Sequence, residues 1–543
     1  MKILACSLGL LLLTGAASAD PYAASRAKVQ KLNKSRNYKE AYDLLRTFIF
    51  KPDADPDLLA RQDFDEGHNA LQQLRRQSEL DGFLEEVVEA HSDHWQVLLR
   101  IAQAYQFLPH QGFIIAGEFK RGHHRGGGRY VNTRERDRIR SLQLFKLAAD
   151  AVDPRADKAR VAELYFQFGS ALAQWRSYGN AWRMQYLSDL SALPDYTEGH
   201  YYGYGRENKG APVDAEGKPV YYGEPDAWKN AANDGERWRW ALAEAVRWSP
   251  ALAPRVKRER ADFLFNQFGV QTMVQYGWYF SGRQVMDDDK VNESGTYALH
   301  TLKDTETLAR LATGIKRFEL PDHHNFVKLY SELKAHDQLG RVYLNRRQYP
   351  EAAKSFRRAG NRFTKQVEQI EENWGQIQPT VTQPAGKGPE LQYRFRNGTG
   401  VQFSAQHIKV DLLLKDVRTH IESKPKQLDW RKVNVGNIGY RIVQQNESRY
   451  LGARAASWKV KLKPLPDHFD RQVTISTPLQ QPGAYLVTAR MSDGNESKIV
   501  LWVSDTVIVK KRMASNRDEL VGKKGEKKAS DYYFVADARS GEP

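Results

Sequence analysis

The stretch LGRVYLNRRQYPEAAKSFRRA, residues 339–359, decides the fold of the first two thirds of the chain. Its apolar and small residues recur at three- and four-residue steps, the period of an amphipathic helix. They are Leu339, Gly340, Tyr343, Tyr349, Ala352, Phe356 and Ala359. Small residues at 340, 352 and 359 let two helices approach closely, while the large residues fill the space between them. The stretch therefore predicts a pair of packed helices.

The same spacing is typical of a tetratricopeptide repeat, although His336 and Thr364 stand where Trp and Pro are usual. Weaker copies of the step at 349–352 occur upstream, at 38–41 and 178–181. Helical steps also link Leu308 to Leu311 and Ile315. We therefore predict an N-terminal α-solenoid of tetratricopeptide-like helix pairs over residues 20–375.

Two segments interrupt the helical period. Residues 119–130 read FKRGHHRGGGRY, and residues 200–225 are rich in Tyr and Gly. Within the second, residues 212–220 predict a small hairpin with its turn at Glu216-Gly217. We expect both segments to be loops on one face of the helical array.

The composition changes after Trp374. Residues 376–389 contain three prolines and two glycines without a helical period, which predicts a linker. Residues 390–509 then alternate apolar and polar side chains, interrupted by one predicted helix at about 412–421. This pattern predicts an antiparallel β-sandwich.

The end of the chain differs again. Residues 510–531 hold eight Lys or Arg against four acids and predict a basic, flexible connector. Residues 532–536, YYFVA, then predict a new strand. Since such a strand needs partners, we expect 532–543 to be the start of a truncated next β-domain.

The N-terminus predicts export. Residues 3–13 form a short apolar run after Lys2, and Ala17-Ser18-Ala19 is a small-residue cleavage site, so residues 1–19 form a signal peptide. We expect a periplasmic or extracellular protein without a membrane span, because no other long apolar run occurs. Cys6 is the only cysteine. The mature chain therefore excludes disulfides, cysteine nucleophiles and zinc–thiolate sites.

The net charge of the 543-residue chain is +16. Export argues against nucleic acid as the partner, which leaves two interpretations open. The charge either attracts anionic envelope polymers and head groups or serves solubility alone.

Three stretches near the C-terminus carry a family resemblance. They are Pro482–Ala489 (PGAYLVTA), Ile499–Asp505 (IVLWVSD) and Tyr533–Pro543 (YFVADARSGEP). In this order they resemble the alpha-2-macroglobulin family in its bacterial branch, as does a helical repeat region before the first macroglobulin domain. The resemblance implies a macroglobulin-like sandwich and a non-enzymatic endopeptidase inhibitor that traps target proteases. The family's C-x-E-Q thioester and bait region are absent from this chain, so the resemblance implies the N-terminal scaffold part.

Candidate chemical sites are sparse, and we expect no catalytic, cofactor-binding or metal site. The pairs His91/His94, His123/His124 and His323/His324 lack the further ligands that a metal needs. Asp287–Asp289 lacks the pattern of a calcium loop. Tyrosines at 201–204 and 221–222 suit either a stacking platform or a packed hairpin, and we favour the hairpin.

Two other functions remain open. One is a non-enzymatic exported repeat-protein adaptor that binds peptides or envelope components on the concave face of the solenoid. The other is an exported carbohydrate-active enzyme, which only the aromatic content favours.

Overall fold

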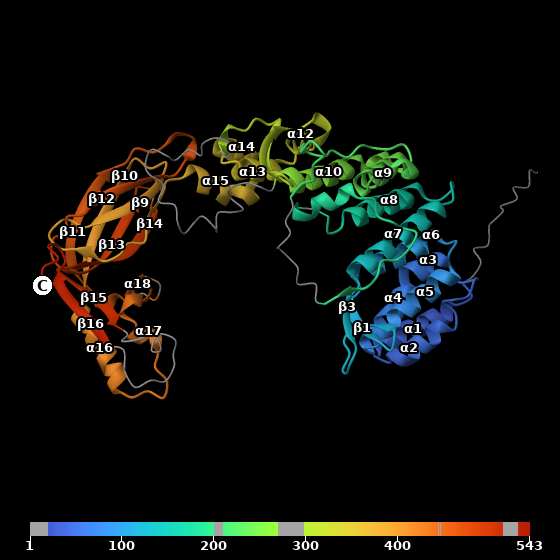
Figure 1. Cartoon of the computed structure of the whole chain (residues 1–543), viewed down its shortest axis with the longest axis horizontal. Coiled ribbons are helices and arrows are strands. Elements are labelled where there is room, and N and C mark those ends of the chain that lie inside the picture. The colour runs from blue at the N-terminus through green and yellow to red at the C-terminus, as the bar shows by residue number, and fades with distance from the viewer. Residues whose placement is uncertain are drawn as a thin grey trace, which may run out of the picture. The chain divides into compact units, whose positions relative to one another are not determined.

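Figure 1 shows a computed structural model of the chain. It describes residues 20–176, 178–199, 210–269, 298–443, 445, 447–492, 494–513 and 530–543. The predicted signal peptide, the tyrosines at 201–204, the aspartates at 287–289 and residues 514–529 of the predicted connector lie outside this set. The chain divides into two compact units: the first spans Met1–Gln271 and Thr307–Leu329, and the second spans Thr272–Glu306 and Tyr330–Pro543.

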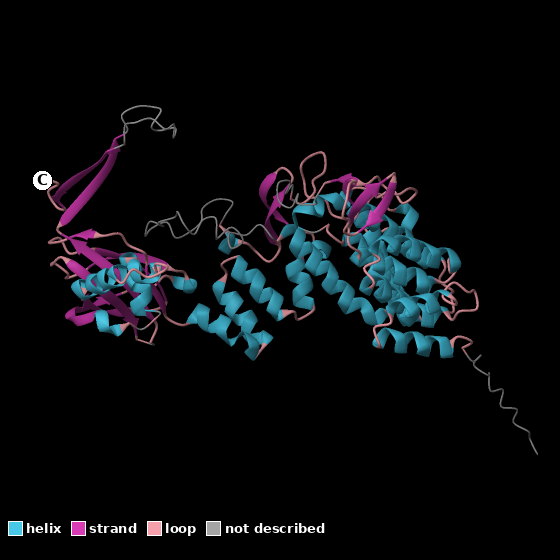
Figure 2. Ribbon diagram, turned by 90° about the horizontal axis from the view of Figure 1, so that it is seen from below, coloured by secondary structure: helices cyan, strands magenta, loops and turns pink. Residues whose placement is uncertain are grey.

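Helices dominate the first unit, and antiparallel sheets dominate the C-terminal part of the second (Figure 2). The predicted order of an α part followed by a β part is therefore confirmed. The helices of the first unit are α1 (Ala23–Lys34), α2 (Tyr38–Arg46), α3 (Pro56–Leu58), α4 (Phe64–Gln73), α5 (Leu80–Ala90), α6 (Trp95–Phe107), α7 (Arg134–Asp150), α8 (Lys158–Ala173), α9 (Asp234–Trp248) and α10 (Ala253–Phe268).

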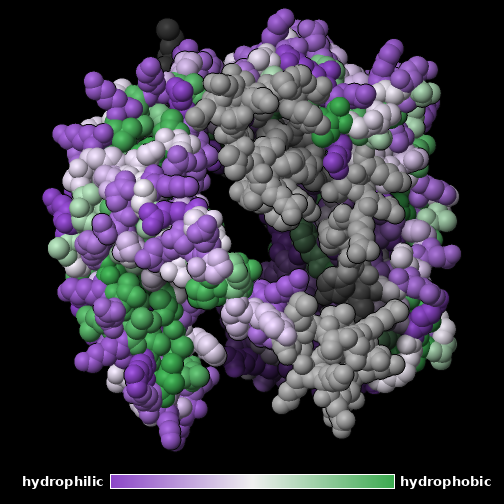
Figure 3. Space-filling view, turned by 60° about the vertical axis from the view of Figure 1, so that its left-hand side comes forward, coloured by the Kyte–Doolittle hydropathy of each residue, from purple (hydrophilic) through white to green (hydrophobic). Residues whose placement is uncertain are grey.

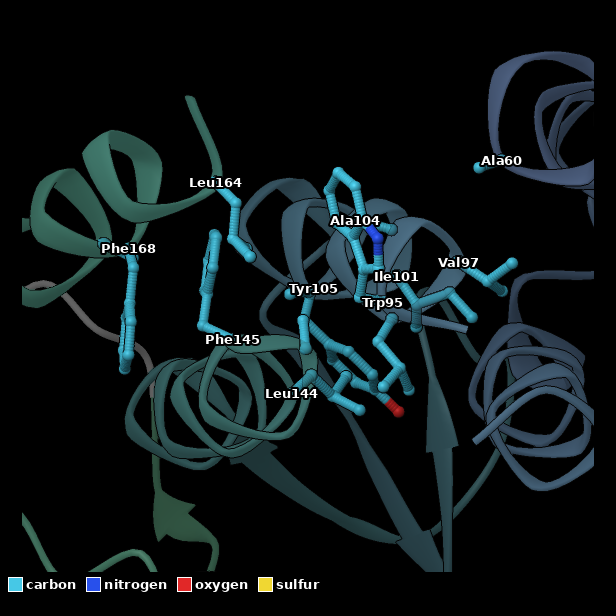
Figure 4. Close-up of a cluster of buried hydrophobic side chains, with 14 of the residues drawn as sticks. Ala60, Trp95, Val97, Ile101, Ala104, Tyr105, Leu144, Phe145, Leu164 and Phe168 are labelled. Carbon is cyan, nitrogen blue, oxygen red and sulfur yellow. The ribbon is translucent and has the colours of Figure 1, made fainter. Parts of the chain in front are cut away.

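A continuous apolar core joins α1 to α10. Figure 4 shows part of it, including the buried side chains of Trp95 and Tyr105 from α6 and Phe145 from α7. The rings of Phe145 and Phe168 stack with their centroids 5.4 Å apart and thereby join α7 to α8. Because each helix buries its apolar face against its neighbours, tertiary packing rather than helix propensity stabilises these helices.

Four helices end in the same way. Helices α1, α4, α12 (Phe326–Glu332) and α13 (His336–Asn345) are each followed by a basic residue with positive φ: Arg36, Arg75, Lys334 and Arg347, between +52° and +63°. The next amide in each case donates to the carbonyl five residues earlier, as from Asn37 to Leu32 at 2.9 Å. This is the Schellman motif, in which glycine is the usual residue.

The opening stretch folds as a helix pair. Helix α13 and α14 (Tyr349–Ala359) pack against each other, and Ala352 is fully buried. A Cβ atom on Gly340 would lie 2.6 Å from the ring of Phe356, so only glycine permits this approach. The predicted close packing of these two helices is confirmed.

Residues 119–130 are not the continuous loop that the glycines suggested. Strands β1 (Gln111–Ile115), β2 (Glu118–Arg121) and β3 (Arg129–Asn132) form an antiparallel sheet, with β4 (Thr197–Glu198) at the edge of β3. Only residues 122–128 connect β2 to β3. The glycines serve this connection, where Gly122, Gly126 and Gly128 have positive φ.

The helical interpretation of Leu308, Leu311 and Ile315 is wrong. Residues Glu306–Leu311 form β5, residues Gly314–Glu319 form β6, and the two strands pair. Gly314 has a φ of +114°, which a helix does not accommodate and a turn between strands does. Apolar residues three or four apart occur by chance on short strands, so the period misled here.

Two sheets pack together in the second unit. The first has the strand order β11-β10-β13-β14-β8 and the other the order β12-β9-β7. Their bounds are β7 (Trp374–Ile377), β8 (Gln383–Pro384), β9 (Glu390–Arg396), β10 (Gly400–Ile408), β11 (Leu451–Lys461), β12 (Arg471–Ser476), β13 (Gly483–Met491) and β14 (Glu496–Ser504). The sheets share one apolar core, in which the rings of Tyr393 on β9 and Phe403 on β10 lie 5.5 Å apart.

The predicted linker at 376–389 is wrong in part. Strand β7 ends at Ile377 and pairs with β9, while β8 pairs in parallel with the end of β14. Pro384 fits because β8 lies at the edge of its sheet, where a missing amide proton costs little. Ala385 joins the shared core.

A helical insertion follows β10. Helices α16 (Val410–Glu422), α17 (Trp430–Val433) and α18 (Ile438–Val443) precede β11, and α16 matches the predicted helix at about 412–421. A second small core joins this insertion to β13, through Leu413, Ile438, Ile442 and Leu486 among others. Among the described residues, the second unit also contains α15 (Thr364–Glu371).

The terminal strand has a partner. Strand β16 (Ser530–Asp537) pairs antiparallel with β15 (Thr506–Met513). The expectation that Tyr532–Ala536 has no partner strand in this chain is therefore wrong. The start of the predicted flexible connector, residues 510–513, belongs to β15. The run of three β-branched residues Val507-Ile508-Val509 was the signal for this strand.

Candidate binding surfaces

The histidine pairs do not assemble into metal sites. His91 is buried on α5's C-terminal side, and its Nε2 lies 2.7 Å from the carbonyl of Ile49. Its ring stacks on His94 at 5.9 Å. Burial lowers the pKa of His91, partly offset by that carbonyl. In the described ranges, no group of three or more His, Cys, Asp or Glu side chains is placed to hold a metal ion.

His123 and His124 lie exposed in the connection 122–128. The ring of His124 contacts Phe113 of β1 at 5.8 Å. This contact anchors the connection on the sheet and assigns no chemistry to it.

His324 and its neighbour His323 have different surroundings. His323 is exposed, whereas the Nε2 of His324 lies 3.3 Å from the carbonyl of Tyr222. Burial lowers the pKa of His324 to about 4, and the nearby guanidinium groups of Arg239 and Arg260 add to this effect. His324 is therefore neutral and packed.

The predicted hairpin at 212–220 is present. Val213 pairs antiparallel with Pro219, and Gly217 has a φ of +78°. Next to it, Tyr222 is buried and Tyr221 packs on Phe268 at 5.5 Å. These two tyrosines belong to a packed core rather than to an open stacking platform, as we favoured.

A buried charge network was missed by the sequence reasoning. Arg121 of β2 donates to Asp137 of α7 at 2.8 Å and to Asp81 of α5 at 2.5 Å. Burial opposes its charge, but the two carboxylates outweigh burial and raise its pKa. Burial likewise opposes the charge of Asp137, yet hydrogen bonds from His110 and Arg121 lower its pKa. The network ties the sheet β1–β3 to the helices.

The network borders a cavity of about 490 Å³. Its aromatic wall is the stacked pair Phe119 and Tyr196, at 4.9 Å. The guanidinium groups of Arg121 and Arg136 already lie over these rings, at 5.3 Å and 4.7 Å from the ring centroids. The charged groups and rings that line the cavity already have partners within the protein. We therefore interpret these contacts as ones that stabilise the fold.

The ribbon formed by β15 and β16 carries a concentration of exposed apolar side chains. The face drawn in Figure 3 shows hydrophobic patches among largely hydrophilic side chains. The exposed residues of the ribbon are Val507, Ile508, Val509, Tyr532, Tyr533, Phe534 and Val535, and Ile508 is 63% exposed. Because neighbouring residues of a strand point to opposite faces, both faces of the ribbon are apolar. An exposed apolar patch of this kind marks an interaction surface.

A built turn follows the ribbon. The side chain of Asp537 accepts hydrogen bonds from the amides of Arg539 and Ser540, both at 2.9 Å. Gly541 has a φ of +75°, and its amide donates to the Asp537 carbonyl at 2.9 Å. These contacts explain why the stretch D-A-R-S-G has this sequence: Asp caps the turn and Gly permits it.

Comparison with known proteins gives limited similarity. No protein-family model matches the chain, and no curated protein matches it. Two solved fragments of native alpha-2-macroglobulin from Escherichia coli are similar, each with 14% identity and a TM-score of 0.19. The fragment spanning domains MG0-NIE-MG1 aligns over 31% of this chain, which covers 46% of that fragment. The fragment spanning NIE-MG1 aligns over 32% of this chain and 72% of its own length.

No helix of the described residues is both long and apolar enough to cross a membrane.

Proposed function

We propose that the chain is the N-terminal scaffold of an exported, non-enzymatic alpha-2-macroglobulin-like inhibitor that traps proteases. The observation that carries this proposal is the position of the three motif stretches. PGAYLVTA falls on β13, IVLWVSD on β14, and YFVADARSGEP on β16 and its turn. These strand positions support the role that the family resemblance implies for each stretch.

The two sheets with their shared core are then a macroglobulin-like sandwich, and the helices before it a solenoid of tetratricopeptide-like pairs. In this account the ribbon β15–β16 begins the next β-domain. Its two apolar faces and the Asp537 turn support this role, since a two-stranded ribbon is marginally stable without further strands. Export through the signal peptide at 1–19 belongs to the same proposal.

The gene tests the proposal directly. We expect the reading frame to continue beyond codon 543 and to encode further β-domains of about 100 residues each, a typical size for β-sandwich domains. A C-x-E-Q thioester stretch is compatible with the account without being required by it. A stop codon immediately after Pro543, with no related frame nearby, would favour the adaptor instead.

A further inference from the structure

A groove of about 800 Å³ lies on the outer face of the five-stranded sheet. Its floor comes from β10 and β13, with Ser404, Gln406 and Thr488 among its polar side chains. Ile442 and Val443 of α18 form an apolar wall, and Arg454 and Ser457 of β11 line it as well. The volume lies in the range of ligand sites, about 300–1,000 Å³.

The groove is bordered by an open sheet edge. Strand β11 is eleven residues long and, among the described strands, pairs with β10 alone. Ala456, Trp458 and Val460 point to the core. The alternate residues Ser457, Lys459 and Lys461 therefore lie on the outer face, as the groove does. The backbone groups on the free side of such an edge are available to another strand.

The groove and its edge are cationic. Among the lining residues, Arg454, Arg490 and Lys498 are basic, and Glu496 is the acid. Arg490 and Lys498 both bind Glu496, so this carboxylate is shared between two cations. Lys459 and Lys461 extend the positive charge along β11 and are exposed. The surface therefore complements an anionic ligand.

We propose that the free edge of β11, beside this groove, binds an extended acidic peptide segment, which adds to β11 as a further strand. The free backbone edge favours a peptide over other anionic ligands. Its alternating amide and carbonyl groups can pair with a peptide backbone and not with a polysaccharide. Acidic side chains on one face of the bound strand would reach Arg454 and Lys459. This binding site goes beyond the proposed trapping function and lies in a different region from the ribbon.

Binding is measured with the whole chain from Asp20 by fluorescence anisotropy. The probe is a labelled eight-residue peptide that alternates glutamate with threonine or valine. We expect saturable binding that weakens as salt is added, because exposed charges are screened. A peptide with lysine in place of glutamate should not bind. The same acidic peptide with alternate amides N-methylated keeps its charge but cannot pair with β11, and we expect it to bind at least about tenfold more weakly.

Charge reversal locates the site. The variant Arg454→Glu should weaken binding at least about tenfold, with circular dichroism showing the native fold. Arg454→Gln, which is milder, should weaken it in the same direction. The matched control is Arg155→Glu, an exposed arginine of the first unit, which changes net charge equally and should leave affinity within about twofold.

Three results would overturn the proposal. The first is unchanged affinity in both Arg454 variants. The second is equal affinity for the N-methylated peptide, which excludes strand addition. The third is binding of polygalacturonate, an anionic polysaccharide, in an Arg454-dependent manner when the acidic peptide does not bind.

Discussion

Individual charged residues decide how the sheet β1–β3 is held on the helices of the first unit. Arg121 is nearly fully buried, with Asp137 equally buried and Asp81 partly so. Removing one partner of a buried ion pair leaves an uncompensated charge, which costs far more than losing an exposed pair. The same sheet contains an exposed pair for comparison, Arg129 with Glu198.

We therefore expect Arg121→Ala to lower the free energy of unfolding of the first unit by about 3–5 kcal/mol. Arg129→Ala, the control on β3 of the same sheet, should change it by less than about 1 kcal/mol. Urea unfolding followed by circular dichroism measures both. Equal effects in the two variants would show that the Arg121 network does not anchor the sheet.

His324 makes the stability of the first unit depend on pH. Its pKa is lowered to about 4 in the folded protein, mainly by burial, against about 6.5 in the unfolded chain. Between these values the unfolded chain binds a proton that the folded protein does not. Stability is therefore lost as the pH falls through this window, and it changes no further through His324 below about pH 4.

We expect this loss of unfolding free energy to be about 1–2 kcal/mol. It is smaller than the free energy that corresponds to the whole pKa shift, because His324 is not fully buried. His324→Gln removes the titrating group. The difference in unfolding free energy between wild type and variant, measured from about pH 7 to about pH 4, should follow the predicted direction. A difference that is constant with pH would contradict the lowered pKa.

At the level of elements, the turns between helices repeat one geometry with an unfavourable residue. Arg36, Arg75, Lys334 and Arg347 occupy the left-handed position in which glycine is unstrained. The sequence does not reveal these turns, since a basic residue near a helix end is also typical of an ordinary last turn.

Arg36 offers the clearest test because its side chain is exposed. We expect Arg36→Gly to stabilise the first unit by about 0.5–1 kcal/mol, because glycine relieves the positive φ. Lys28→Gly in the middle of α1 should destabilise it by about 1 kcal/mol, since there φ is helical. Thermal unfolding of both variants measures the sign, and destabilisation by Arg36→Gly would contradict the assigned turn.

The helix pair α13–α14 is the element that the sequence predicted best. Ala352 has no exposed surface, so Ala352→Leu should overpack the contact and cost about 1–3 kcal/mol. Lys354→Leu places the same side chain on the exposed face of α14 and is the control. Calorimetry of the whole chain compares the two, and equal melting temperatures would show that Ala352 does not lie in the contact.

Local signals account for what the sequence predicted correctly and what it did not. The alternating strands β9, β10, β13 and β14 have long, regular patterns, and they were predicted. Strand β5 was mistaken for helix because both of its faces are largely buried, so that Leu308 and Leu311 happen to lie one helical step apart. Pro384 suggested a linker because proline is rare inside sheets. Its place in the edge strand β8, where proline is tolerated, is visible only once the strands are paired. The buried contacts of Arg121 join residues 40 and 16 positions away, which no local pattern reveals.

For the whole molecule, we propose that the two units form one scaffold and that the ribbon β15–β16 begins the next domain. If the ribbon needs further strands, the chain ending at Pro543 should expose an apolar surface that binds a hydrophobic dye. Replacing Ile508 and Phe534 by threonine should reduce that dye binding without lowering the melting temperature of the sheets. Unchanged dye binding would show that the ribbon is not the exposed surface.

Protease trapping by the full-length protein is the decisive measurement for the proposed function. The product is incubated with an endopeptidase, and hydrolysis is measured with a small peptide substrate and with a large protein substrate. A protease caged by the inhibitor keeps its active site but is shielded from large molecules. We therefore expect cleavage of the peptide to be retained and cleavage of the protein to be lost. Full cleavage of both substrates, or equal loss of both, would contradict it.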